Sequence, residues 1–268
     1  MAEPAPEFDQ QPETPRHVLT AVEFDVLWER LGLGPTPVVL RLESPGRTHA
    51  ERRAIEAAGW QALRVRGLAG PSGPDPELSR LLNLLARPAG QLELRAWWGR
   101  SVRAVAAGRP GTGALAVCQD ATVALTRCNS LPSGLLAVLP AAGAGAGRAC
   151  TVPTDTLAAA LTAPPAQRRA VLLGRDVPPG EAGLLVRMLA GTERRAQIVA
   201  LAADRWGVLH RSGGVLGVLD GPRGRYLLTR TTGDDGVDWS TLAPTDDRRL
   251  RHRLSELLGA ATAAVGGS

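Results

Sequence analysis

The chain between Gln91 and Cys128 alternates apolar and polar residues. From position 91 to 98 the apolar set is Leu92, Leu94, Ala96 and Trp98, and the intervening set is Gln91, Glu93, Arg95 and Trp97. This period of two is typical of a half-buried strand. Shorter alternating runs follow, separated by turns at Gly99-Arg100, Gly108 to Gly113 and Gln119-Asp120. Strands this short and closely connected predict an antiparallel meander.

A similar pattern returns between Ala196 and Thr231. Three features recur in the same order, namely a Trp-Gly turn, a glycine turn and a Leu-Thr-Arg strand end. The pairs are Trp98-Gly99 with Trp206-Gly207, Gly111 to Gly113 with Gly213-Gly214, and Leu125 to Arg127 with Leu228 to Arg230. We interpret them as an internal duplication of about 40 residues with pseudo-twofold symmetry, because a solenoid needs three or more repeats. The alternative is that any two meanders look alike.

Helix signals lie outside the two meanders. Capping boxes at Thr20 to Glu23 and Thr48 to Glu51 predict two helix starts. Asp75-Pro76 predicts a third, because Asp is a good N-cap and Pro suits the first helical position. We expect a strand over Pro37 to Leu42, which begins with proline and continues with apolar residues.

The last predicted helix follows the second meander. Its apolar stripe consists of Leu250, Leu254, Leu257, Leu258 and Ala261. We expect this stripe to be buried, either on this chain or on a partner.

These elements predict an α+β fold of two pseudo-symmetric halves, each an antiparallel meander with packed helices. We expect a proline-rich, acidic, disordered tail over residues 1–17 and an N-terminal half over 18–140. Residues 141–150 begin with Ala and Gly and predict a flexible linker. The C-terminal half is expected over 151–262, followed by a frayed tail over 263–268.

Composition narrows the function. All 31 basic residues are arginine, and the net charge of +5 is spread along the chain without the clustered basic run of a nucleic-acid footprint. Three cysteines without a CxxC motif fit a reducing compartment. We find no signal-peptide layout and no apolar run long enough to cross a membrane, so we expect a cytoplasmic protein.

Chemistry-bearing motifs are missing from the sequence. His17, His49, His210 and His252 have no ligand-type neighbours at metal-binding spacing. Gly143 to Gly147 lacks the following Lys of a phosphate-binding loop and fits a linker better. The acid pairs Asp234-Asp235 and Asp246-Asp247 fit a loop and a helix start. We therefore expect no metal, no cofactor and no enzymatic activity.

The best candidate for a partner-binding site is Trp97. If Trp98 faces the core with Leu92 and Leu94, alternation turns Trp97 outward, unless a helix covers that face too. Trp and Arg are enriched at binding hot spots. The candidate set is Trp97 with Arg95, Arg100 and Arg103, and with Leu254 and Leu258 of the last helix as a second wall.

Several segments resemble one known family when they are taken in order. They are Val26 to Gly34, Ser44 to Arg52, Leu82 to Pro88, Asp204 to Gly207, Pro222 to Leu228 and Ala243-Pro244. This order, spread over residues 18–262, is similar to the EspG family of actinobacterial proteins associated with type VII (ESX) secretion.

The resemblance implies a two-half α+β fold with a central sheet. It also implies a cytosolic chaperone that binds the helical tip of PPE proteins in PE–PPE pairs and keeps these substrates soluble for export. In that family the sheet, a loop between early strands and the C-terminal helical bundle contact the client. Here the loop corresponds to the short Trp98-Gly99-Arg100 turn. We expect a monomer or weak homodimer, and the alternative function is a nucleic-acid-binding or regulatory module.

Overall fold

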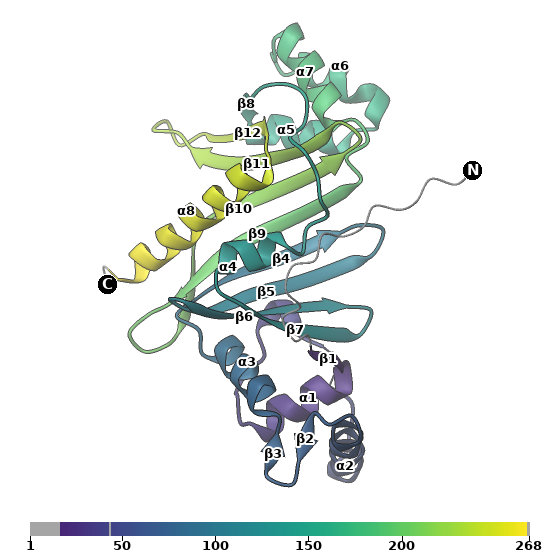
Figure 1. Cartoon of the computed structure of the whole chain (residues 1–268). Helices are drawn as coiled ribbons and strands as arrows, with labels where there is room; N and C mark the ends of the chain where they lie inside the picture. The colour runs from purple at the N-terminus through teal and green to yellow at the C-terminus, as the bar shows by residue number, and fades with distance from the viewer. Residues whose placement is uncertain (1–16, 43, 267–268) are drawn as a thin grey trace, which may run out of the picture.

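One ten-stranded antiparallel sheet runs through the whole molecule (Figure 1). The computed structural model describes residues 17–42 and 44–266. The predicted tail lies outside this range except for its last residue, His17, which begins the first strand. The strand order is β1-β7-β6-β5-β4-β9-β10-β11-β12-β8. The strands are β1 (His17–Thr20), β4 (Gly90–Trp97), β5 (Ser101–Arg109), β6 (Thr112–Gln119), β7 (Thr122–Cys128), β8 (Cys150–Pro153), β9 (Arg194–Ala203), β10 (Leu209–Gly221), β11 (Gly224–Thr232) and β12 (Asp238–Pro244).

The helices precede and follow each meander. They are α1 (Ala21–Arg30), α2 (His49–Val65), α3 (Pro76–Ala86), α4 (Leu131–Leu136), α5 (Thr154–Thr162), α6 (Arg168–Leu173), α7 (Pro179–Leu189) and α8 (Asp247–Gly266). Short 3₁₀ turns occur at η1 (Val38–Leu40) and η2 (Pro165–Gln167), and β2 (Ala69–Gly70) and β3 (Gly73–Pro74) form a separate small ribbon. The predicted caps at Thr20, Thr48 and Asp75 are confirmed, because each side chain accepts a backbone N–H bond at its helix start.

The strand order is the same when it is read from either edge, which confirms the two pseudo-symmetric halves. Each half begins with a four-residue edge strand, β1 or β8, continues through helices, and forms a four-stranded meander. Each then ends in a helix, α4 or α8. The meanders meet at the central pair β4–β9, where Leu94 pairs with Ile198.

The structure corrects two of the residue matches used to infer the duplication. Gly213 and Gly214 lie in β10 at an irregularity in the pairing with β9, and not in a hairpin turn. The Leu-Thr-Arg segments lie in β7 and β11, which are the fourth strand of one meander and the third strand of the other. The fourth strand of the second meander is β12, so this meander ends at Pro244 and not at Thr231. The Leu-Thr-Arg match therefore paired a fourth strand with a third strand.

The expected strand over Pro37 to Leu42 is also wrong. Residues 38–40 form the 3₁₀ turn η1, in which Val39 and Leu40 are fully buried. This turn packs against β5 as part of the N-terminal core. Its apolar residues are buried by a single turn, so no pairing with another strand is needed.

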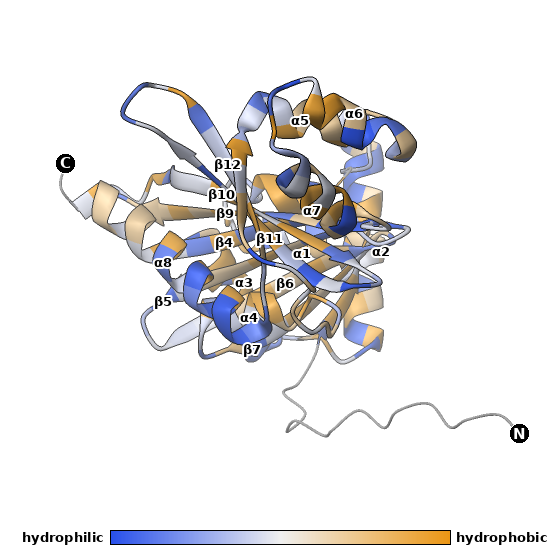
Figure 2. Cartoon of the chain, turned by 90° about the horizontal axis from the view of Figure 1, so that it is seen from above, coloured by the Kyte–Doolittle hydropathy of each residue, from blue (hydrophilic) through white to orange (hydrophobic). Residues whose placement is uncertain are grey.

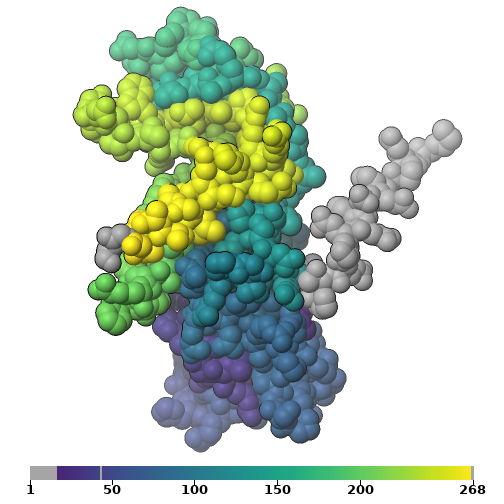
Figure 3. Space-filling model, turned by 60° about the vertical axis from the view of Figure 1, so that its left-hand side comes forward, coloured from purple at the N-terminus to yellow at the C-terminus, as the bar shows by residue number. Residues whose placement is uncertain are grey.

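One face of the sheet, called here the α8 face, is covered by α4 and α8. Its core contains Leu92, Leu94, Ile198, Leu250 and Leu254, all fully buried. In Figure 2 the apolar residues, coloured orange, include parts of the central strands that lie between the helices. Figure 3 shows α8 in yellow lying across the outside of this face. The apolar stripe of the last helix is therefore buried on this chain.

The opposite face, called here the groove face, carries two separate helical lobes. In the N-terminal half, α1 and α3 pack on β5, β6 and β7, with Phe24 and Trp28 in the core. In the C-terminal half, α5, α6 and α7 form a second core with Tyr226 and Leu242. Figure 1 shows these lobes at opposite ends of the sheet. They leave part of the central strands between them without a helical cover.

The segment between the halves is bonded to β11. Gly143 accepts the backbone N–H of Arg225, and Gly145 donates its own to the Arg225 carbonyl. The Tyr226 hydroxyl donates to the Ala146 carbonyl at 3.0 Å. Residues 143–146 are therefore hydrogen-bonded to the start of β11, beside the hairpin formed by β10 and β11. The exact domain boundaries stay a prediction.

Candidate functional site

The candidate site is a cavity of about 470 Å³ on the groove face, which we call the central groove. Strands β4, β9, β10 and β11 form its floor, and α5, the first residue of α6 and the turn after α7 form one wall. The lining residues used below are Arg95, Trp97, Leu161, Arg168, Arg195, Gln197 and Arg230. Two of them, Trp97 and Arg95, belong to the candidate set from the sequence.

Trp97 faces away from the α8 face and lies in the groove with 49% of its surface exposed. Its neighbour Trp98 packs, half-buried, against the core of the α8 face. Alternation along β4 causes this split, since successive side chains of a strand point to opposite faces. The chain then reverses in the Trp98-Gly99-Arg100 turn. Gly99 takes a left-handed φ of 78° there, and the Trp98 N–H donates to the Arg100 carbonyl.

Strand pairing places further polar residues beside Trp97 and Arg95. Trp97 pairs with Arg195 of β9, and Arg95 pairs with Gln197 of β9 on one side and Arg103 of β5 on the other. The same alternation that turns Trp97 outward turns Arg195 and Gln197 outward. This signal was readable in the sequence once β4 and β9 were known to be neighbours, but their pairing was not.

The groove carries a surplus of positive charge. Within residues 17–42 and 44–266, Arg95, Arg195 and Arg230 form no ion pair. Arg168 donates to the Leu189 carbonyl at 3.1 Å, while its Nε is buried without a partner. Guanidinium groups left in this way favour an acidic or hydrogen-bonding ligand.

Glu93 is the acidic group on the same strand face. Its carboxylate accepts a 2.8 Å bond from the Gln91 amide. Burial raises the pKa of Glu93, against the opposing pull of the Arg95 and Arg211 charges. Glu93 does not line the central groove, so the arginines that do line it keep their surplus of positive charge.

The other predicted residues lie elsewhere or are already engaged. Arg103 donates to the Arg41 carbonyl at 2.8 Å and to the Cys118 sulfur at 3.2 Å, so it anchors the segment after η1. Arg100 is exposed and lies 3.6 Å from Asp120 in the turn between β6 and β7. Leu254 of α8 is fully buried between this helix and the sheet, and Leu258 lies in the same layer. Helix α8 covers the opposite face, so it does not form a second wall with Trp97.

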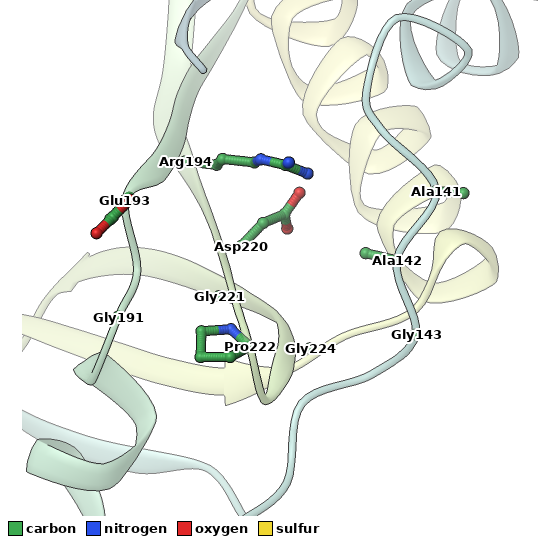
Figure 4. A pocket seen from close by; sticks show the side chains of 10 residues that line it. All are labelled: Ala141, Ala142, Gly143, Gly191, Glu193, Arg194, Asp220, Gly221, Pro222 and Gly224. Carbon is green, nitrogen blue, oxygen red and sulfur yellow. The ribbon is translucent and has the colours of Figure 1, made fainter. Parts of the chain in front are cut away.

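A second cavity, of about 480 Å³, lies beside residues 141–143 (Figure 4). Arg194 extends toward Asp220 across it, and Glu193 points away. Asp220 is already bonded to Arg225 at 2.8 and 2.9 Å. This cavity contains none of the candidate partner-binding residues from the sequence, and its buried carboxylate is already paired. We therefore assign no binding role to it and regard it as a gap between packed segments.

Comparison with known proteins gives the family. A family model described as the EspG family matches residues 20–256. The chain belongs to the EspG family. Its fold is similar to that of the Mycobacterium tuberculosis type VII secretion system chaperone EspG5, solved in complex with a PE25-PPE41 dimer. That match has a TM-score of 0.69 and 14% identity, and covers 92% of this chain and 96% of EspG5. A comparison with curated proteins finds no match.

Membership of the EspG family agrees with the resemblance noted from the ordered segments. The two-half fold with one central sheet is therefore the fold of an EspG family member. Among the helices of the described residues, none is long and apolar enough to cross a bilayer. No group of metal-ligating side chains gathers within those residues either.

Proposed function

We propose that this EspG family protein is a cytosolic chaperone of type VII secretion, which binds the helical tip of a PPE-like substrate in the central groove and keeps it soluble for export. The observation that carries the proposal is Trp97, half-exposed on the floor of the groove. An exposed aromatic beside arginines that have no ion pair within the described residues is the composition of a binding hot spot. The EspG5 complex with PE25-PPE41 supports a PE–PPE pair as the client class.

The shape of the groove suits a helical tip. Leu161, which is 37% exposed, and Leu228 add apolar surface next to Trp97, and arginines border it. An apolar centre with hydrogen-bonding groups around it is the usual anatomy of a specific interface. We expect a monomer or weak homodimer, and a non-catalytic, binding role.

The test is a titration of a purified PE–PPE pair from the same genome against this chain and its Trp97→Ala variant. A hot-spot Trp is worth at least about 2 kcal/mol, which is roughly thirtyfold in Kd. Trp206→Ala is the matched control, because Trp206 is 77% exposed at the tip of the β9–β10 hairpin and away from the groove. Binding that survives Trp97→Ala with the fold intact would move the site elsewhere.

A basic groove also attracts nucleic acid, so the competing function needs its own arm. Binding to single-stranded DNA through phosphates falls steeply as salt rises. Contact between a client tip and Trp97 depends on salt much less. Tight, steeply salt-dependent DNA binding that is unaffected by Trp97→Ala would favour the nucleic-acid function.

A further inference from the structure

The charge of the central groove has a complement within this same chain. Residues 1–16 contain four acids, Glu3, Glu7, Asp9 and Glu13, and a single base, Arg16. They also contain Phe8, an apolar side chain in the middle of the acids. The family model begins only at residue 20, so this segment lies outside the part of the chain that matches the family. We call residues 1–16 the acidic segment.

The acidic segment starts from a position within reach of the groove. His17 pairs with Leu125, and that row of the sheet continues through β6 and β5 to Glu93 of β4. Strands lie about 4.8 Å apart, so four spacings separate His17 from β4 by about 19 Å. Trp97 lies four residues further along β4, which adds about 13 Å. These two offsets combine to a direct distance of about 23 Å. The nine residues from Phe8 to His17 span about 30 Å when extended, so Phe8 reaches Trp97 with a few ångströms to spare.

The chemistry of the two partners matches residue class by residue class. Arg95, Arg195 and Arg230 are exposed in the groove and lack ion pairs within the described chain, and carboxylates are their preferred partners. Trp97 offers an exposed ring to an aromatic side chain such as Phe8. A proline-rich segment loses less conformational entropy on docking than a flexible one.

We propose that the acidic segment docks in the central groove of its own chain, with its carboxylates on the groove arginines and Phe8 against Trp97. The segment then occupies the surface assigned above to the client and competes with it. Only this competition rests on the proposed function, because the docking follows from charge and reach alone. A tethered segment has an effective concentration in the millimolar range, so even weak docking excludes weak ligands.

The experiment uses a fluorescently labelled peptide of sequence 1–16 and two full-length proteins. One is the wild type. The other carries Glu3→Gln, Glu7→Gln, Asp9→Asn and Glu13→Gln, which neutralise the acids without shortening the chain. We expect the neutralised protein to bind the peptide at least about tenfold more tightly, because its own segment no longer competes. Equal affinity for the two proteins would overturn the proposal.

Charge reversal then locates the docking surface. In the neutralised protein, Arg95→Glu with Arg195→Glu should weaken peptide binding at least about tenfold. The matched control is Arg248→Glu with Arg251→Glu, an equal charge change on exposed residues of α8, where binding should stay within about twofold. Equal effects of both pairs would mean that the peptide responds to net charge only, and the proposal would fail.

Two outcomes separate this inference from the proposed function. If a PE–PPE pair binds through Trp97 while the peptide does not bind, the chaperone function stands and the docking is wrong. If the peptide binds through the arginines while no PE–PPE pair does, the docking stands alone. A difference between wild type and neutralised protein that grows with protein concentration would place the segment on a second copy and overturn docking within one chain.

Discussion

The third strand of each meander begins at the same place in the fold, but the side chains that fill this place differ between the two halves. In the N-terminal half, Gly108 pairs with Gly113, one step before the two-residue turn between β5 and β6. In the C-terminal half the corresponding pair, one step before the two-residue turn between β10 and β11, is Asp220 with Arg225. A helix start lies over each pair, from α4 in one half and α8 in the other.

Because Gly108 and Gly113 lack side chains, α4 and the turn between β5 and β6 can approach them closely. A Cβ on Gly113 would lie 2.6 Å from the Leu131 side chain of α4, and a Cβ on Gly108 would lie 2.3 Å from the Thr112 carbonyl. In the other half, Arg225 is fully buried and bonds Asp220, Asp247 of α8 and the Pro140 carbonyl. Burial opposes the charge of Arg225, but the bonds and charge of Asp220 raise its pKa overall.

The comparison shows that one backbone framework accepts two solutions to the same packing problem. A six-residue helix with a Ser130 N-cap sits directly on glycine. The twenty-residue α8 is held by an arginine whose side chain also bonds the Pro140 carbonyl and whose backbone bonds Gly143 and Gly145. The half that carries the longer helix is thus the half that carries a buried ionic cluster.

The largest expected effect comes from Arg225→Ala. It leaves the 7%-exposed Asp220 buried without its partner, and breaking a buried pair costs about 3–5 kcal/mol. Urea unfolding of the variant measures the loss. Replacing both residues together, Asp220→Leu with Arg225→Met, should recover most of it, because no unpaired charge remains. A loss below about 1 kcal/mol for Arg225→Ala would show that the cluster is dispensable.

Leu254→Ala is expected to cost about 2–5 kcal/mol, because it opens a cavity in the core of the α8 face. Client affinity of the folded fraction should be unchanged, since Leu254 lies on the face opposite to Trp97. Thermal unfolding together with a binding titration checks both halves of this expectation. Reduced affinity at full stability would instead assign Leu254 to the interface.

Gly108→Ala should cost about 1–3 kcal/mol, because the added methyl meets backbone atoms that cannot rotate away. Gly214→Ala is the matched control, because the atom nearest to its added methyl would lie 4.0 Å away. The difference between the two melting temperatures is the measurement. If both variants melt alike, the N-terminal hairpin has more room than its glycines indicate.

The smallest effect is expected at Trp206. Both Trp98 and Trp206 precede a left-handed glycine at a hairpin end, with φ values of 78° and 80°. Trp206 is 77% exposed, so Trp206→Ala should change stability by less than about 0.5 kcal/mol. Trp98→Ala removes a half-buried ring from the core and should cost clearly more. Equal losses in a denaturation series would mean that the two turns are equivalent.

The sequence predicted local features well, because their causes are local. Thr20 and Thr48 cap helices through contacts three residues away, and alternation along β4 turned Trp97 outward. The edge strands β1 and β8 were missed, since four residues carry too little alternation to recognise. The Leu-Thr-Arg match failed because a period of two says which face a residue takes, but not which strand of a meander it occupies.

The candidate site was predicted only in part for the same reason. The stripe of α8 required burial, but nothing in the helix itself indicated which face of the sheet it would cover. Arg103 looked free in the sequence, whereas the Arg41 carbonyl, which it bonds, reaches it only in the folded chain. Arg195 and Arg230 entered the site through the pairing of the two halves, which is a long-range feature.

The brevity of the outermost strands has a consequence for self-association. An unpaired strand edge is a template on which another chain can add by backbone hydrogen bonding, and long flat edges polymerise. Within residues 17–42 and 44–266 this sheet has ten strands, yet β1 and β8 at its two borders contain four residues each, and β8 ends in Pro153. The broad sheet therefore presents little border on which a neighbouring copy could grow, and its contacts with other proteins are left to its faces.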